Sequence, residues 1–212
     1  MSAERRFKTE GIVLKESPLG ENGKLLVIFS REYGKMTAAA KGVRKPGSAM
    51  IQLAQLFAYS ELELYRGNSG LYTLTGGTLI EPFRGLGEDY DRIREAGAMS
   101  SVLLKIIQEE LPDEETLRLF LNSLYLIAAG RRRPDFVRCV FLLKLTQYQG
   151  LQPDPWEIER QWGKPLLSGT KAALRHLSEA DDGDSLFGFG VSADVLSELA
   201  GIASMLSHEL IN

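Results

Sequence analysis

Residues 36–48 read Met-Thr-Ala-Ala-Ala-Lys-Gly-Val-Arg-Lys-Pro-Gly-Ser, a strand of small residues that breaks at its first glycine. Strand propensity falls at this glycine and again at Pro46, because proline cannot donate a hydrogen bond to a β-ladder. The side chains of Lys41, Arg44 and Lys45 are therefore predicted to lie on a turn that the neighbouring strands hold in place. Loops on a rigid scaffold commonly form contact surfaces. The alternative interpretation is a solvated turn with incidental charge.

Five short strands are predicted around this turn. They are residues 7–15, residues 24–30, the strand that begins at Met36, residues 58–66 and residues 71–80. Residues 58–66 alternate between apolar and polar side chains, and turn-forming residues such as those at 18–23 and 68–70 separate the strands. The pair Gly76 and Gly77 indicates a bulge or a barrel corner. Because no long helix lies between the strands to cover parallel neighbours, the pattern predicts a small antiparallel barrel.

After Pro82 the hydrophobic period changes from that of strands to that of helices. Helices are predicted from Asp89 or Asp91 to Leu111, from Asp113 to Gly130, from Pro134 to Gly150, from Thr170 to Glu179, and after a cap at Ser192. The pattern lapses in a loop segment rich in proline and tryptophan (residues 151–169), and residues 181–184 are predicted to form a polar loop. The predicted fold class is α+β with two domains: a five-stranded antiparallel barrel in residues 1–80 and an all-helical domain in residues 81–212.

The distribution of charge is more informative than its total. The net charge is −3, which by itself does not indicate a polyanionic partner. Residues 1–50 hold ten Lys or Arg against five Asp or Glu, whereas the remaining residues hold 15 against 23. This asymmetry predicts one basic face suited to a polyanion, with chance as the alternative. No apolar run has the length of a membrane span or of a signal-peptide core, which predicts a cytoplasmic protein without a membrane partner.

The sequence shows no pattern typical of catalysis or metal binding. Cys139 is the only cysteine, and the two histidines are His176 and His208, so neither a disulfide within the chain nor a set of zinc ligands is expected. Residues 20–24 resemble a phosphate loop, but they lack its first glycine and the Ser or Thr that should follow the lysine. Cys139 lies in a helical apolar pattern and is predicted to be buried. We therefore expect a binding protein without a cofactor rather than an enzyme.

Cations and aromatic residues of the predicted barrel fit the binding of nucleic acid. Proteins that grip single strands combine a line of cations with aromatic rings on which bases stack. The candidate cations are Lys15, Lys24, Arg31, Lys35, Lys41, Arg44, Lys45 and Arg66. The candidate stacking residues are Tyr33, Tyr59, Tyr65 and Tyr72, with core packing as the alternative for each. A second basic cluster, Arg131, Arg132 and Arg133, ends the second predicted helix, where cations would also offset the helix dipole.

Several short motifs occur in an order that a known family shares. They are Gly-Ile-Val-Leu at 11–14, Glu-Asn-Gly-Lys-Leu-Leu at 21–26, Phe-Ser-Arg-Glu-Tyr-Gly-Lys at 29–35, Ala-Lys-Gly-Val-Arg-Lys at 40–45, Glu-Pro-Phe at 81–83 and Gly-Leu-Gln-Pro at 150–153. This order resembles the bacterial RecO family of DNA repair proteins. The resemblance is most specific before residue 90.

The resemblance implies an N-terminal OB-fold followed by a helical domain. It also implies a recombination mediator that binds single- and double-stranded DNA, anneals complementary strands, and helps RecA to load onto single strands coated by SSB. The implied partners are RecR, SSB through its C-terminal tail, and in some pathways RecF, and the implied location is the nucleoid in the cytoplasm. The expected role of Lys41, Arg44 and Lys45 in DNA binding agrees with the independent charge argument.

The sequence departs from the family pattern after Pro153. Many members carry four cysteines of a zinc motif there, whereas residues 154–168 hold none. Metal binding is therefore not carried over, and we expect Trp156, Trp162 and the prolines to pack this segment instead. Relatives also often continue into a basic tail beyond the position of Asn212.

Two other functions remain open from the sequence alone. An OB-fold protein that binds RNA would show the same cations and aromatic residues, because these do not distinguish ribose from deoxyribose without a contact to the 2′-hydroxyl. A protein-interaction module would bind a partner peptide in its helical grooves, and its basic turn would serve only solubility.

Overall fold

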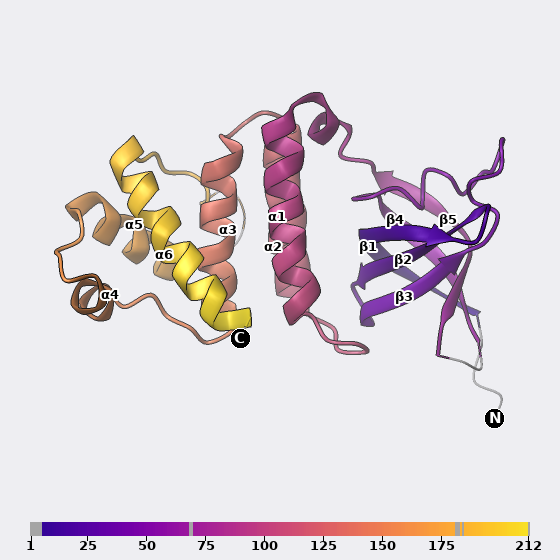
Figure 1. Ribbon diagram of the computed structural model, residues 1–212, viewed down its shortest axis with the longest axis horizontal. Helices are drawn as coiled ribbons and strands as arrows, with labels where there is room; N and C mark the ends of the chain where they lie inside the picture. Colours follow the sequence, from indigo (N-terminus) through magenta and orange to yellow (C-terminus); the bar gives the residue numbers. More distant parts are fainter. Residues whose placement is uncertain (1–5, 68–69, 181–182, 184, 212) are drawn as a thin grey trace. The chain divides into compact units, whose positions relative to one another are not determined.

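The computed structural model describes residues 6–67, 70–180, 183 and 185–211, and it begins with a closed barrel of five strands (Figure 1). The strands are β1 (Arg6–Leu19), β2 (Gly23–Ser30), β3 (Gly34–Ala40), β4 (Tyr59–Arg66) and β5 (Tyr72–Glu81). Their order around the barrel is β1-β2-β3-β5-β4. A five-stranded barrel of this Greek-key type is the OB-fold, so the predicted barrel is confirmed.

One pair of neighbouring strands departs from the antiparallel prediction. β3 and β5 run parallel and pair through Ala38 with Tyr72 and through Ala39 with Thr73. The other four neighbouring pairs are antiparallel. A closed ring with an odd number of strands cannot alternate direction throughout, so a five-stranded barrel must contain such a pair.

Alternate side chains of the strands fill the barrel. The inward residues of β2 to β4 include Leu26, Ile28, Met36, Leu62 and Leu64, each at most 2% exposed. β5 carries the bulge that the glycine pair predicts: Glu63 pairs with Gly76 but Leu64 pairs with Leu74, so one residue of β5 is extra. The bulge lets the strand curve around the core.

A segment from beyond the first helix returns to the barrel. Residues Ile107–Leu117, which we call the strap, form one compact unit with Met1–Arg84. The backbone N–H of Lys35 donates to the carbonyl of Gln108 at 2.9 Å. Gly34 has a φ of 62°, and a Cβ added to it would lie 2.1 Å from the carbonyl oxygen of Leu111. Only glycine therefore permits this close approach.

The first helix ends earlier than predicted, where the strap begins. That helix is predicted to reach Leu111, but it ends at Ile106, because the residues that follow pair with the start of β3 instead. The sequence also predicts that the barrel domain ends at residue 80, and it does not predict that residues 107–117 return to the barrel. Helical periodicity is local, whereas the strap is held by backbone contacts to a distant strand.

The remaining chain is helical. After η1 (Arg84–Glu88), a short 3-10 helix, come α1 (Tyr90–Ile106), α2 (Glu114–Ala128), α3 (Pro134–Tyr148), α4 (Pro155–Trp162), α5 (Ser168–Glu179) and α6 (Ala193–Ile211). Gly85–Ile106 and Arg118–Asn212 form the second unit. α3 is buried along most of its length and contacts α1, α5 and α6, which surround it (Figure 1). It is the central helix of this unit.

α4 lies in the segment that the sequence predicts to be a loop, so that prediction is wrong. Pro155 occupies the first turn, where a missing N–H costs nothing, and Asp154 caps the helix by accepting a hydrogen bond from the N–H of Trp156 at 2.9 Å. Gly163 ends it with a φ of 65°. Because Ile158 is the only buried residue of this short helix, no apolar period could reveal it.

Other local predictions are confirmed. The N–H of Val195 donates a hydrogen bond to the side-chain oxygen of Ser192 at 3.3 Å, so Ser192 is the predicted cap of α6. Cys139 is 1% exposed, and burial raises the pKa of its thiol to about 12. The loops predicted at 68–70 and 181–184 lie outside the described residues, apart from Gly70 and Gly183.

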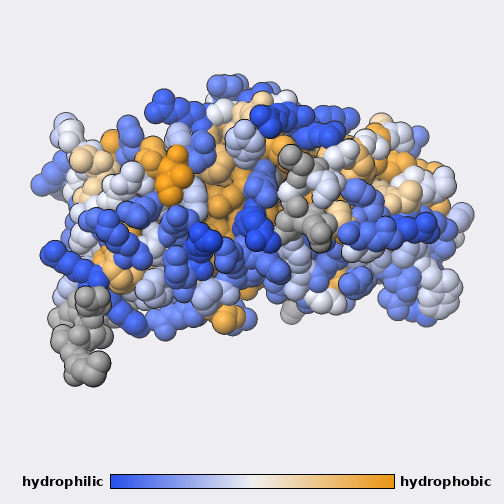
Figure 2. Space-filling model, turned by 180° about the vertical axis from the view of Figure 1, so that it is seen from behind, coloured by the Kyte–Doolittle hydropathy of each residue, from blue (hydrophilic) through white to orange (hydrophobic). Residues whose placement is uncertain are grey.

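Hydrophilic side chains cover most of the face shown in Figure 2, with smaller hydrophobic areas between them. None of the described helices has both the length and the hydropathy to cross a membrane.

Candidate nucleic-acid interface

The basic turn begins directly where β3 ends. We give this name to three cations, Lys41, Arg44 and Lys45. The N–H of Lys45 donates to the carbonyl of Gly42 at 3.1 Å, and the N–H of Arg44 donates to the carbonyl of Asn22 at 3.0 Å. The second bond ties the turn to the β1–β2 hairpin. Val43 lies fully buried between the cations and anchors the turn to the barrel core.

The three side chains of the basic turn are exposed. Within the described part of the chain, no hydrogen bond or ion pair engages their charged groups. Lys15 of β1 is exposed in the same way. These four cations are therefore open to an anionic ligand.

Arg44 also borders a small pocket of about 270 Å³ beside the hairpin. Lys24 forms another wall, but its Nζ lies 2.6 Å from Glu16 Oε2 and donates to the carbonyl of Ala54 at 3.0 Å. The Lys24 side chain is only 16% exposed. Lys24 therefore holds the end of the barrel together, and among the predicted cations it is poorly placed for a phosphate.

The other predicted cations of the barrel are held by acceptors of the strap. Arg31 pairs with Glu114, and Arg66 pairs with Glu110. The Nζ of Lys35 donates to the carbonyl of Ile107 at 3.2 Å. Among the described residues, the eight predicted barrel cations thus divide into four without a partner for their charged group and four whose charged group contacts an acceptor of the protein.

The candidate stacking residues mostly serve packing. The ring centroid of Phe7 lies 4.7 Å from that of Tyr33 and 5.7 Å from that of Tyr72. Tyr72 is 6% exposed. The hydroxyl of Tyr59 donates to Glu10 at 2.6 Å, and burial together with this carboxylate raises the pKa of Tyr59. Tyr65 is half-buried in β4. None of these four rings lies in the segment that carries the basic turn.

Two apolar side chains in the segment from β3 to β4 were not singled out by the sequence patterns. Ile51 and Leu56 are 45% and 39% exposed, although large apolar residues are usually buried. They share the segment with the basic turn and offer apolar surface that could meet bases. The sequence around these two residues has no regular hydrophobic period that would have marked them as exposed.

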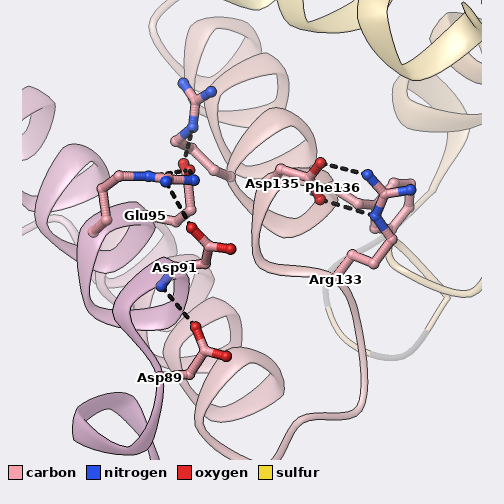
Figure 3. A network of polar contacts seen from close by, with 8 residues as sticks. Asp89, Asp91, Glu95, Arg133, Asp135 and Phe136 are labelled. Atoms are coloured by element: carbon pink, nitrogen blue, oxygen red, sulfur yellow. Dashed lines mark hydrogen bonds and ion pairs between the residues drawn. The ribbon is translucent and has the colours of Figure 1, made fainter. Parts of the chain in front are cut away.

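The second basic cluster is engaged in local contacts at the end of α2. Arg131 lies over the Tyr125 ring at 5.1 Å, and Arg132 donates to the carbonyl of Phe189 at 3.5 Å. Arg133 donates to both oxygens of Asp135, at 3.2 and 2.6 Å (Figure 3). Burial opposes this pairing, yet the bonds from Arg133 and the backbone lower the pKa of Asp135.

A buried carboxylate joins two helices near this cluster. Glu95 of α1 is 5% exposed and forms ion pairs with Arg94, at 2.7 Å, and with Arg138 of α3 (Figure 3). A buried charge is stable only when it is paired in this way. The Glu95–Arg138 pair joins α1 to α3, and both arginines form ion pairs with carboxylates of α1.

The segment that lacks the family cysteines is packed only in part by its tryptophans. Trp162 is half-buried and lies close to Gly201 of α6. Trp156 is 64% exposed, with Arg160 5.0 Å from its ring, so the expectation that it packs the segment is wrong. Among the described residues, no three His, Cys, Asp or Glu side chains are grouped to hold a metal ion.

The fold and the basic turn together define a class: an OB-fold barrel with an exposed cationic turn, continued by a helical unit. Two family models match this chain, "Recombination protein O N terminal" at residues 1–83 and "Recombination protein O C terminal" at residues 87–155. The chain belongs to the RecO family.

Curated relatives agree with the family models. A protein of Acetivibrio thermocellus is 38% identical over 147 residues, which are 69% of this chain and 58% of the relative. One of Desulfitobacterium hafniense is 38% identical over 69% of this chain and 53% of the relative, and one of Bacillus pumilus is 31% identical over 84% and 66%. Each is named DNA repair protein RecO. This chain thus spans between half and two thirds of the length of these relatives.

Proposed function

We propose that this protein is a DNA-binding recombination mediator in DNA repair. The observation that carries the proposal is the basic turn: three exposed cations without a described partner, held against an OB-fold barrel by a buried valine and a backbone hydrogen bond. Membership of the RecO family supports it. The proposed ligands are single- and double-stranded DNA.

The basic turn would act on the phosphate backbone. Binding releases the counterions that a strand holds, so the affinity falls as salt rises. Bases carry no charge that the turn could read, and we therefore expect weak sequence preference. Neutralising the phosphates of two complementary strands also lowers their mutual repulsion, which is how the protein would promote annealing.

This action requires positioning and charge but no bond rearrangement. We therefore propose a protein without enzymatic activity and without a cofactor. We propose further that RecR and the C-terminal tail of SSB are its partners, and that with RecR it helps RecA to load onto SSB-coated strands at the nucleoid. Family membership is the support for these partners.

The proposal is tested by fluorescence anisotropy with a labelled single-stranded oligonucleotide across a salt series. About four phosphate contacts, one for each open cation, at about −0.7 each predict a log–log salt slope of roughly −2.8 for the wild type. The triple variant Lys41→Glu, Arg44→Glu, Lys45→Glu removes three contacts, so its slope should fall to roughly −0.7 and most affinity should be lost.

A matched control carries the same change in charge at three other exposed cations, Arg84→Glu, Lys105→Glu and Arg175→Glu. It should retain most of the affinity. Equal losses in both triple variants would assign binding to net charge and contradict a role for the basic turn. Absence of wild-type binding in low salt would favour the protein-interaction module, and preference for RNA of matched sequence would favour the RNA-binding alternative.

A further inference from the structure

Two carboxylates of the strap lie on arginines of the barrel. Oε1 of Glu114 is 2.5 Å from Nη2 of Arg31, and Oε1 of Glu110 is 2.6 Å from Nη2 of Arg66. Arg31 also contacts Glu10 at 3.4 Å. The two arginine side chains are 47% and 56% exposed, so both ion pairs are open to solvent.

Arg66 lies beside the aromatic ring of Tyr72. The Arg66 guanidinium lies 5.8 Å from the centroid of the Tyr72 ring, and the Tyr72 hydroxyl donates to Glu110 at 3.4 Å. Tyr33 and Tyr72 both contact Phe7. Because Tyr72 is only 6% exposed, these rings pack the barrel, and the two arginines are the groups of this surface that a phosphate could contact.

The strap has the composition of a phosphate competitor. Residues 107–117 hold five acidic residues, Glu109, Glu110, Asp113, Glu114 and Glu115, and no basic residue. A carboxylate offers an arginine the same charged hydrogen-bond acceptors as a phosphate. The strap backbone is anchored next to these pairs through Lys35 and the close approach of Gly34 to Leu111. Glu110 itself has a φ of 56°, a conformation that non-glycine residues adopt only when their surroundings impose it.

We propose that the strap closes a second nucleic-acid site of the barrel. The site consists of Arg31 and Arg66, and Glu114 and Glu110 occupy the positions that backbone phosphates would take on them. Exposed ion pairs are weak, so a single strand at sufficient concentration can replace the two carboxylates. The inference rests on the proposed function, because it assumes that the ligand is a single strand.

The test removes the two ion pairs between the strap and the barrel arginines and leaves the strap itself in the chain; we call this variant the opened strap. Glu110→Gln with Glu114→Gln keeps the size of both side chains and removes the strap carboxylate from each arginine, while Arg31 keeps its longer contact with Glu10. The affinity for a labelled single-stranded oligonucleotide should rise about threefold for each released arginine, or about tenfold for the pair, and the salt slope should steepen by about 1.4.

The matched control is Glu109→Gln with Glu115→Gln. It removes the same charge from the same strap, but among the described residues neither side chain pairs with a cation. This control should change the affinity less than twofold, as expected for a remote charge. Adding Arg31→Gln and Arg66→Gln to the opened strap should abolish its gain. Thermal unfolding of each variant verifies that the barrel stays folded.

The outcomes separate this inference from the proposed function. An equal gain in both glutamine pairs, or no gain in the opened strap, would overturn the strap proposal. The triple variant of the basic turn tests the proposed function on its own. If that variant loses binding while the opened strap gains none, only the strap proposal fails; if the opened strap gains binding that Arg31→Gln and Arg66→Gln abolish, the strap proposal stands whatever the triple variant does.

Discussion

At the residue scale, single glycines and charges decide what each surface can do. Gly34 lets the strap approach β3, and no rule of local propensity would select it over the other glycines of the chain. The cations illustrate the same point. The sequence identifies eight barrel cations, but which of them are neutralised depends on carboxylates that lie 44 and 83 residues away for Arg66 and Arg31. Sequence patterns therefore predicted the basic turn, but they did not predict that other barrel cations are paired with acceptors of the protein.

The close contact between Gly34 and the strap can be tested by substitution, with Gly20 as the control. Gly34→Ala should lower the free energy of unfolding by more than about 2 kcal/mol, because the added Cβ combines an unfavourable positive φ with a clash against the Leu111 carbonyl. Gly20→Ala shares a positive φ (60°), but no heavy atom lies within 4 Å of its Cβ. It should cost about 1 kcal/mol. Urea denaturation of both variants measures the difference, and equal costs would contradict the tight contact between strap and barrel.

At the scale of elements, regular periods were predictive and irregular contacts were not. Most strands and the long helices lie close to their predicted bounds, because burial imposes a period on them. β1 is an exception, since it continues to Leu19 through residues that were predicted to form a turn. α4 was missed because it buries a single residue, and its one proline, Pro155, lies in the first turn of the helix. The end of α1 was placed too late because the strap, not the local sequence, stops the helix.

The cap of α4 supplies a prediction at this scale. Asp154→Ala should lower the stability of the second unit by about 1 kcal/mol, because the N–H of Trp156 then loses its acceptor. Asp154→Asn keeps an acceptor and should cost only a few tenths of that amount. Thermal or urea unfolding compares the two variants. If Asp154→Asn destabilised the protein as much as Asp154→Ala, the side chain would not act as a cap.

At the scale of the whole molecule, the sequence provides only the net charge of a range of residues, whereas the fold decides which cations are paired and which are not. An excess of cations in residues 1–50 pointed to a polyanion, and the fold divides the barrel cations between an exposed basic turn and a set paired with acceptors of the strap. The fold class and family could be predicted because motif order and periodicity are properties of the chain. The allocation of charge could not, since it depends on contacts made only after folding.

If the basic turn brings DNA strands together, the rate of strand annealing depends on its three cations. Two complementary oligonucleotides, one with a fluorophore and one with a quencher, are mixed with wild type, with the triple variant of the basic turn, or with the control Arg84→Glu, Lys105→Glu, Arg175→Glu. We predict that wild type and control accelerate annealing equally and that the triple variant leaves it near the spontaneous rate. Annealing by the triple variant at the wild-type rate, or no acceleration by the wild type, would contradict the account.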